Sequence, residues 1–255
     1  SIERIKVKLC SYFHLNSIPK NSEILGAIIS SREEYDNLYG PKNIDDLIKA
    51  LVKKPMRTIS GVAPVAIMTP PSKCPHGRCI YCPGGIEFNT PQSYTGREPA
   101  ALRAAEYNYD PYDQVEARLR QYMAIGHPID KIDLIIMGGT FPAQDEKFQA
   151  QFIKRALDAL NNHRAGAKSL YHAKELNARA RARCIGLTIE TRPDWALKPH
   201  VNMILALGAT RVELGVQSIY DDVLEYVERG HDVSTTVEAT RIIKDAGLKL
   251  CYHIM

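Results

Sequence analysis

The sequence contains no apolar run long enough to cross a bilayer, and its first residues do not form the apolar core of a signal peptide. We therefore predict a cytoplasmic protein with no membrane partner. In that compartment thiols stay reduced, so clustered cysteines indicate a metal site or catalysis more often than disulfides. A strong excess of one charge is also missing. The net charge of +4 permits an anionic partner such as nucleic acid but does not require one.

A glycine-rich phosphate fingerprint is absent after the first predicted strand, which argues against a dinucleotide-binding sheet. Short apolar runs alternate instead with amphipathic helical segments. This alternation predicts an α/β fold with a parallel sheet covered by helices, and a complete or partial β/α barrel fits it. The expected strands are residues 61–69, 131–139, 184–191, 211–218 and 248–255.

The first 55 residues have a different pattern, with apolar positions at helical spacing such as Ile24, Leu25, Ile28, Ile44 and Leu51. We predict a small N-terminal helical unit over residues 1–55 and a partial barrel over residues 56–255. The chain stops inside the fifth expected strand, so we expect a truncated barrel. The basic segments 49–57 and 178–184 are candidate phosphate contacts, although such segments are more often solvated helix faces.

Polar groups follow several of the expected strands at their carboxyl ends, where β/α barrels collect their chemistry. The usual polarity of loops explains polar groups at one or two strand ends, but polar groups at the ends of all five strands are harder to explain in that way. In chain order they are the cysteine loop, Gly138-Gly139-Thr140, Glu190-Thr191-Arg192, Gln217-Ser218 and His253.

Three of the six cysteines, Cys74, Cys79 and Cys82, lie in the stretch CPHGRCIYCPGG. With His76 they could hold a structural zinc ion. Such sites usually tie together two distant ligand pairs, which four ligands within one loop would not do. Three thiolates on one loop suit a cubane iron–sulfur cluster with one iron free to bind a ligand, so we favour the cluster over zinc and both over disulfides.

The order of these features resembles the radical S-adenosylmethionine (SAM) enzymes, in which a three-cysteine loop follows strand one and a glycine pair follows strand two. Within that superfamily the chain resembles the catalytic subunit of the Elongator complex, in its single-chain archaeal and bacterial form. Superfamily members usually space their cysteines C-x3-C-x2-C, and the longer first gap here is normal for this family. The resemblance rests on RTISGVAPVAIMT, CPHGRCIYCPGG, QSYTGREPAALRA, YDPYDQ, GHPIDKIDLIIMGGTF, CIGLTIETRPDW and GATRVELGVQSIYDDVLEYVERGH.

The resemblance implies an enzyme that places a carboxymethyl group on carbon 5 of the wobble uridine (U34) of tRNA, using SAM, a 4Fe-4S cluster and acetyl-CoA. The cluster would cleave SAM to a 5′-deoxyadenosyl radical, which would take hydrogen from the acetyl methyl group. Cys74, Cys79 and Cys82 would hold the cluster. The expected cofactor contacts are Gly138, Gly139, Thr140, Glu190, Arg192 and Gln217, with Lys131 matching a lysine that the family associates with acetyl-CoA.

Several simpler roles remain open for these residues. Glu190 and Arg192 could form an ion pair with each other, and Lys131 could be a surface lysine. Tyr94 could stack on a base, shield a radical or simply pack in the core.

The resemblance further implies tRNA as a partner, held by the N-terminal unit and the basic segments, and it leaves open a homo-oligomer or an Elongator-like assembly. No segment resembles the family's C-terminal acetyltransferase-like domain, so we expect the chain alone to lack it. Two alternatives remain: a non-catalytic tRNA-binding scaffold, or a radical SAM enzyme with another substrate.

Overall fold

The computed structural model describes residues 2–52 and 54–255, and the chain divides into two compact units. The first unit contains the residues up to 63 together with residues 117–130, and the second contains residues 64–116 and 131–255. The division therefore follows residue 63 instead of residue 55, and a later segment joins the first unit. Lys53 of the basic segment 49–57 lies outside the described residues.

Amphipathic helices build the first unit. Their apolar faces meet in a core of Leu25, Ile28, Ile44 and Leu51, as the helical spacing predicted. A buried hydrogen bond of 2.7 Å joins Thr58 Oγ1 to His127 Nδ1. The helical elements are α1 (Ile2–Tyr12), α2 (Asn21–Ser30), α3 (Arg32–Tyr39), α4 (Pro41–Leu51), the 3₁₀ turn η1 (Pro55–Thr58) and the end of α6 (Pro111–Ala124).

The segment 117–130 belongs to the first unit because its residues pack against those helices. A Cβ on Gly126, which has φ +81°, would lie 2.9 Å from Val52 Cγ2 and 3.2 Å from Leu25 Cδ1. The glycine thus permits both the turn and the close approach.

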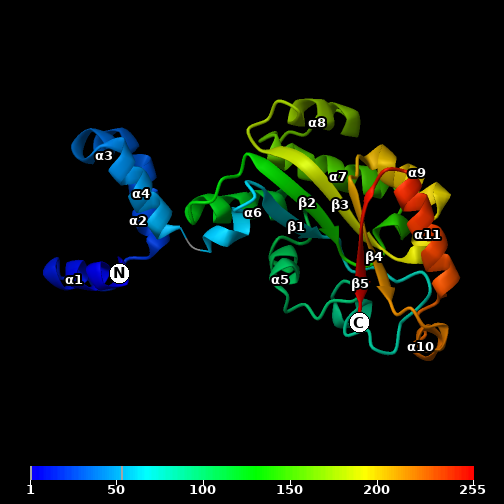
Figure 1. The fold of residues 1–255 in the computed structure, drawn as a ribbon. Coiled ribbons are helices and arrows are strands. Elements are labelled where there is room, and N and C mark those ends of the chain that lie inside the picture. Colours follow the sequence, from blue (N-terminus) through cyan, green and yellow to red (C-terminus); the bar gives the residue numbers. More distant parts are fainter. Residues whose placement is uncertain (1, 53) are drawn as a thin grey trace. The chain divides into compact units, whose positions relative to one another are not determined.

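A five-stranded sheet in the order β1-β2-β3-β4-β5 forms the second unit (Figure 1). The pairs β2–β3, β3–β4 and β4–β5 are parallel, and within the described residues β1 and β5 are the two edges. The expected α/β class with a parallel, incompletely closed sheet is therefore confirmed. The strands are β1 (Ala63–Met68), β2 (Lys131–Met137), β3 (Arg183–Thr191), β4 (Arg211–Gln217) and β5 (Lys249–Ile254).

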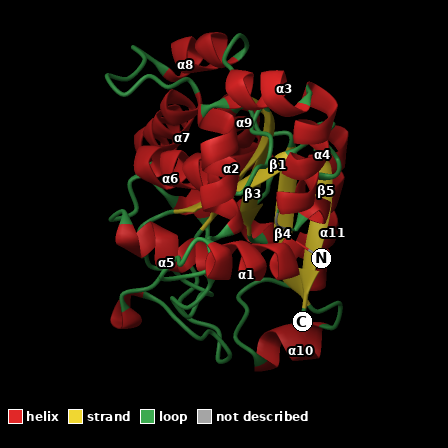
Figure 2. Ribbon diagram, turned by 90° about the vertical axis from the view of Figure 1, so that its left-hand side faces the viewer, coloured by secondary structure: helices red, strands yellow, loops and turns green. Residues whose placement is uncertain are grey.

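Helices cover the sheet, and α7, α9 and α11 pack around its later strands (Figures 1 and 2). Gly208, with φ +95°, ends α9 in the left-handed conformation that favours glycine. Besides the start of α6, the helices of this unit are α5 (Pro99–Glu106), α7 (Glu146–Leu160), α8 (Leu170–Asn177), α9 (Lys198–Leu207), α10 (Asp221–Tyr226) and α11 (Val233–Asp245). No helix among the described residues has both the length and the apolar character needed to span a membrane.

Successive side chains of a strand alternate between the two faces of a sheet, and paired residues of neighbouring parallel strands share a face. One face of this sheet is apolar and buried, as the paired residues Ile136, Ile189 and Val212 illustrate. The other face carries polar residues, among them the neighbouring pair Glu190 and Glu213. The sheet thus separates a packed layer from a polar one.

Candidate active site

The carboxyl ends of the strands meet around a cavity of about 250 Å³. The sheet therefore brings together most of the residues that the sequence singled out. Those lining the cavity are Cys74, Tyr94, Gly139, Thr140, Glu190, Thr191, Arg192, Gln217 and His253, joined by Glu213 and Arg229, which the sequence did not indicate.

Gly138 and Lys131 are placed differently, and Cys79, Cys82 and Ser218 do not line the cavity either. Gly138 does not line the cavity, and its carbonyl accepts a 3.1 Å hydrogen bond from Thr69 Oγ1, which ties the end of β2 to the end of β1. Lys131 is the exposed first residue of β2, at the opposite end of that strand from the cavity. Its contact with acetyl-CoA stays a prediction.

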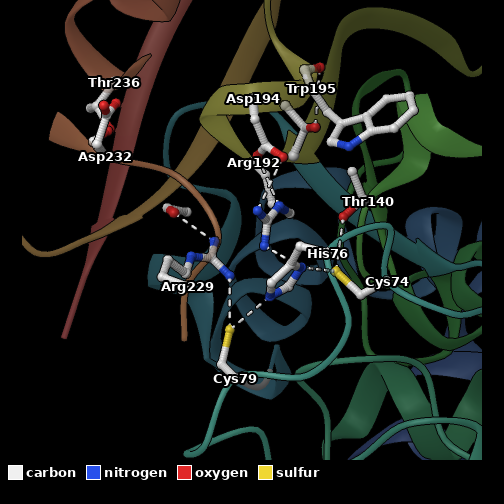
Figure 3. Close-up of polar contacts among 12 residues, drawn as sticks. Cys74, His76, Cys79, Thr140, Arg192, Asp194, Trp195, Arg229, Asp232 and Thr236 are labelled. Carbon is white, nitrogen blue, oxygen red and sulfur yellow. Dashed lines mark hydrogen bonds and ion pairs between the residues drawn. The ribbon is translucent and has the colours of Figure 1, made fainter. Parts of the chain in front are cut away.

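The cysteine loop follows β1 and places Cys79 and Cys82 in buried positions, with Cys74 half-buried. The ring of His76 lies between two of the sulfurs, with Nδ1 3.0 Å from Cys74 Sγ and Nε2 3.1 Å from Cys79 Sγ (Figure 3). These two sulfurs lie on opposite sides of the imidazole. His76 therefore occupies the space between these two thiols.

The segment after the cysteines packs tightly against residues 90–94. A Cβ on Gly84 would lie 1.8 Å from the carbonyl oxygen of Tyr94, so only glycine fits there. Thr90 Oγ1 accepts a 3.1 Å hydrogen bond from the backbone N–H of Gly85. The glycine pair after the third cysteine therefore fixes the loop against the rest of the unit.

Two arginines are buried beside the loop. Arg192 donates to both carboxylate oxygens of Asp194, at 2.9 and 3.0 Å, and its Nη1 bonds His76 Nδ1. Arg229 donates at 2.6 Å to the carbonyl of Gly215, and its Nη1 lies 3.7 Å from Cys79 Sγ. Figure 3 shows the Arg192 guanidinium above the His76 ring and the Arg229 guanidinium to its left, above Cys79.

This environment favours anions. Burial, followed by the charges of Arg192 and Arg229, lowers the pKa of His76 to about 4, so the imidazole is neutral near pH 7. The guanidinium groups cannot lose their charge in this way. Three cysteines on one loop, one of them with its sulfur 3.7 Å from the buried Arg229 guanidinium, fit a thiolate-bound cubane cluster, whose ligands are anionic.

Glu190 lies at the end of β3 and accepts a 2.6 Å hydrogen bond from the hydroxyl of Tyr94. The expected alternative of a Glu190–Arg192 ion pair is therefore wrong, because Asp194 binds the arginine. Burial raises the pKa of Glu190, and the neighbouring Glu213 carboxylate raises it further. Tyr94 thus has a defined polar partner, which the sequence did not predict.

Glu213 and His253 form a second pair on the polar face, with 2.9 Å between Glu213 Oε2 and His253 Nε2. The hydrogen bond from His253 lowers the pKa of Glu213, and the same bond raises the pKa of His253. The cavity therefore combines two carboxyl groups whose pKa values are shifted in opposite directions.

Residues 68–255 match the model of the Radical SAM superfamily. The whole chain is 52% identical to 46% of a protein of Methanocaldococcus infernus named tRNA uridine(34) acetyltransferase. It is 39% identical, again over its whole length, to 46% of human Elongator complex protein 3. These matches confirm the resemblance that the sequence motifs indicated.

A solved structure supports the fold. The archaeal Elp3 of Methanocaldococcus infernus, lacking its first 46 residues, aligns with a TM-score of 0.62 and 45% identity over 76% of this chain and 38% of that one. The chain spans about half the length of the curated relatives it matches.

Proposed function

Because the chain belongs to the Radical SAM superfamily, we propose that it is the SAM-cleaving part of an enzyme that modifies carbon 5 of U34 in tRNA. The observation that carries this proposal is a loop with three free cysteines beside two buried arginines, one of which contacts Cys79 and the other His76 of the same loop. The names of the relatives supply the substrate, tRNA uridine(34). The carboxymethyl product and the use of acetyl-CoA are the finer parts of the proposal.

Cys74, Cys79 and Cys82 would hold a 4Fe-4S cluster through their thiolates, and the site would leave one iron for SAM. When bound, the cluster and SAM supply a carbon-centred radical, which is the difficult chemistry. The protein supplies binding, orientation and the exclusion of water. Burial of Cys79 and Cys82 fits that last role.

The charged residues of the cavity would bind different groups of the cofactor. Arg192 offers a guanidinium fixed by Asp194, which suits a carboxylate. Glu190 is a buried carboxyl whose partner is a tyrosine hydroxyl, so it suits a hydroxyl or ammonium donor of the cofactor. Gly139, with φ +94°, allows a close approach of a ligand to the backbone, and Thr140 and Gln217 add polar groups.

The roles of acetyl-CoA and tRNA belong to the whole protein in this proposal. Lys131 is the candidate contact for acetyl-CoA, and the first unit with the basic segments 49–57 and 178–184 is the candidate contact for tRNA phosphates. A homo-oligomer or an Elongator-like assembly remains a prediction of the resemblance.

The test is anaerobic reconstitution with iron and sulfide, followed by an assay of 5′-deoxyadenosine from SAM with a reductant. We expect the nucleoside to form and its formation to rise with tRNA carrying U34 but not with tRNA carrying cytidine at that position. No cluster and no cleavage in correctly folded protein would overturn the proposal. Cleavage that ignores the wobble base would point to another substrate.

A further inference from the structure

Arg229 is a buried cation at the candidate cluster site that the sequence motifs did not bring forward. It follows α10, and its side chain is only 6% exposed. Arginine is rarely this buried without a paired anion. Within the described residues its Nε has no hydrogen-bond partner, and its other two nitrogens contact a thiol and a backbone carbonyl instead of a carboxylate. A buried guanidinium of this kind retains its charge and requires an anion.

Two glycines leave space for this guanidinium and for the cysteine loop beside it. A Cβ on Gly215 would lie 2.7 Å from Arg229 Nη2, so a larger residue in β4 would displace the arginine. A Cβ on Gly230 would lie 2.8 Å from the Cβ of His76, within the cysteine loop. These two glycines bring Arg229 and the cysteine loop into contact.

The contact itself is between Arg229 Nη1 and Cys79 Sγ, at 3.7 Å, while Nη2 is held at 2.6 Å by the carbonyl of Gly215 (Figure 3). One arm of the guanidinium is thus anchored to the sheet and the other points at a sulfur. A fixed N–H donor aimed at a thiolate ligand is an arrangement that tunes a metal site through its ligand.

Hydrogen bonds to the sulfurs and the local net charge set the reduction potential of an iron–sulfur cluster. A positive charge in a buried site stabilises the more negative, reduced state, because low-dielectric surroundings screen it weakly. We propose that Arg229 acts through Cys79 to raise the reduction potential of the cluster, and that its role is positioning and electrostatic. This inference rests on the proposed function.

Arg192 offers an internal comparison. Its guanidinium makes two hydrogen bonds to Asp194. The negative charge of this carboxylate offsets most of the effect that the positive charge of Arg192 would have at the sulfurs. Arg229 has no such partner among the described residues. We therefore expect the potential to depend more strongly on Arg229 than on Arg192.

The experiment is a redox titration of the anaerobically reconstituted chain, followed by electron paramagnetic resonance without SAM. The variants are Arg229→Gln, Arg229→Lys and Arg192→Gln, and the control is Arg241→Gln, an exposed arginine paired with Glu238 on α11. Iron and sulfide contents are measured on each sample, so that the potential is compared only between loaded proteins. Melting temperatures are measured to separate a structural loss from a change of potential.

At a fixed potential we expect the ratio of reduced to oxidised cluster to fall about tenfold in Arg229→Gln, equivalent to ~59 mV for a one-electron couple. Arg229→Lys keeps the charge without the fork and is expected to fall between that variant and the wild type. Arg241→Gln is expected to match the wild type.

An unchanged ratio in loaded Arg229→Gln and Arg229→Lys would overturn the inference and leave the proposed function standing. A wild-type chain that takes up no cluster would overturn both. If the glutamine variant does not fold, Arg229→Met replaces it as the variant without the charge, and an unchanged ratio in the loaded methionine variant would overturn the inference.

Discussion

The two faces of the sheet in the second unit are built from opposite kinds of residue. On the covered face Ile136, Ile189 and Val212 are paired neighbours and fully buried. On the other face Glu190 pairs with Glu213, and Glu213 with Cys251. A barrel interior is usually filled by layers of branched apolar side chains. The polar face here departs from that rule because it lines the candidate site.

This comparison predicts that the two faces have different roles. Changes on the covered face should affect stability because they open cavities in a close-packed layer. Changes around the polar face should affect cofactor binding and chemistry, with smaller effects on folding. Four experiments test whether the two faces differ in this way.

The largest effect is expected from the cysteine loop, which borders the polar side. Cys79→Ala should abolish cluster uptake and SAM cleavage, because Cys79 is one of three proposed ligands. Cys10→Ala, a cysteine of α1 in the first unit, should retain both. Iron content and 5′-deoxyadenosine formation are the measurements. Equal iron contents in the two variants would contradict the cluster assignment.

The two faces can be compared directly at adjacent residues of β2. Ile136 is fully buried on the covered face, and its neighbour Ile135 is half-buried on the other. Ile136→Ala should lower the free energy of unfolding by about 2–5 kcal/mol, and Ile135→Ala by less. Denaturant titration of both variants measures the difference. Equal losses would show that the polar face is packed as tightly as the covered one.

The contribution of Glu190, on the polar face, to the stability of the protein depends on pH. Burial raises its pKa in the folded protein, so the folded state binds this proton more tightly than the unfolded state, whose glutamates have a pKa of about 4.3. The stability that Glu190 contributes is therefore present below about pH 4.3 and lost as the pH rises through the folded pKa.

We accordingly expect Glu190→Gln to raise the melting temperature at neutral pH, by an amount that shrinks toward acidic pH. The same variant should weaken SAM cleavage if the carboxyl binds the cofactor. A variant less stable than the wild type at neutral pH would show that the Tyr94–Glu190 hydrogen bond outweighs the cost of burying the charge.

The smallest effect is expected on the covered side, at the start of α7. Asp145 accepts hydrogen bonds from the backbone N–H groups of Lys147 and Phe148 and so caps the helix. Asp145→Ala should cost about 1 kcal/mol of stability and leave SAM cleavage unchanged. Thermal unfolding and the nucleoside assay check the two halves of this expectation.

Much of this architecture could be predicted from the sequence, because the periodicity of apolar residues reports local structure. The five expected strands agree closely with those observed, for example residues 211–218 against Arg211–Gln217. Polar residues at strand ends predicted the cavity, since parallel strands bring their carboxyl ends to one edge. The exceptions are Gly138 and Ser218, which follow strand ends but do not line the cavity.

Contacts between residues far apart in the chain could not be predicted from the sequence. The hydroxyl of Tyr94 reaches Glu190, and Arg229 reaches Cys79, through pairings that no local pattern encodes. The segment 117–130 likewise looks like the end of a helix between two strands, yet it packs with the first unit. Such contacts depend on the tertiary fold, which local pattern does not report.

That last feature has a consequence for how the protein is made. Domains generally fold as units during synthesis, starting from the amino terminus. Here the first unit cannot finish folding until residue 130 has left the ribosome, by which time β1 has long been exposed. The next residues, Lys131–Met137, form the strand beside β1. Completion of the helical unit and the first strand pairing of the sheet therefore come within a few residues of each other, and later strands can add one at a time in the order of translation.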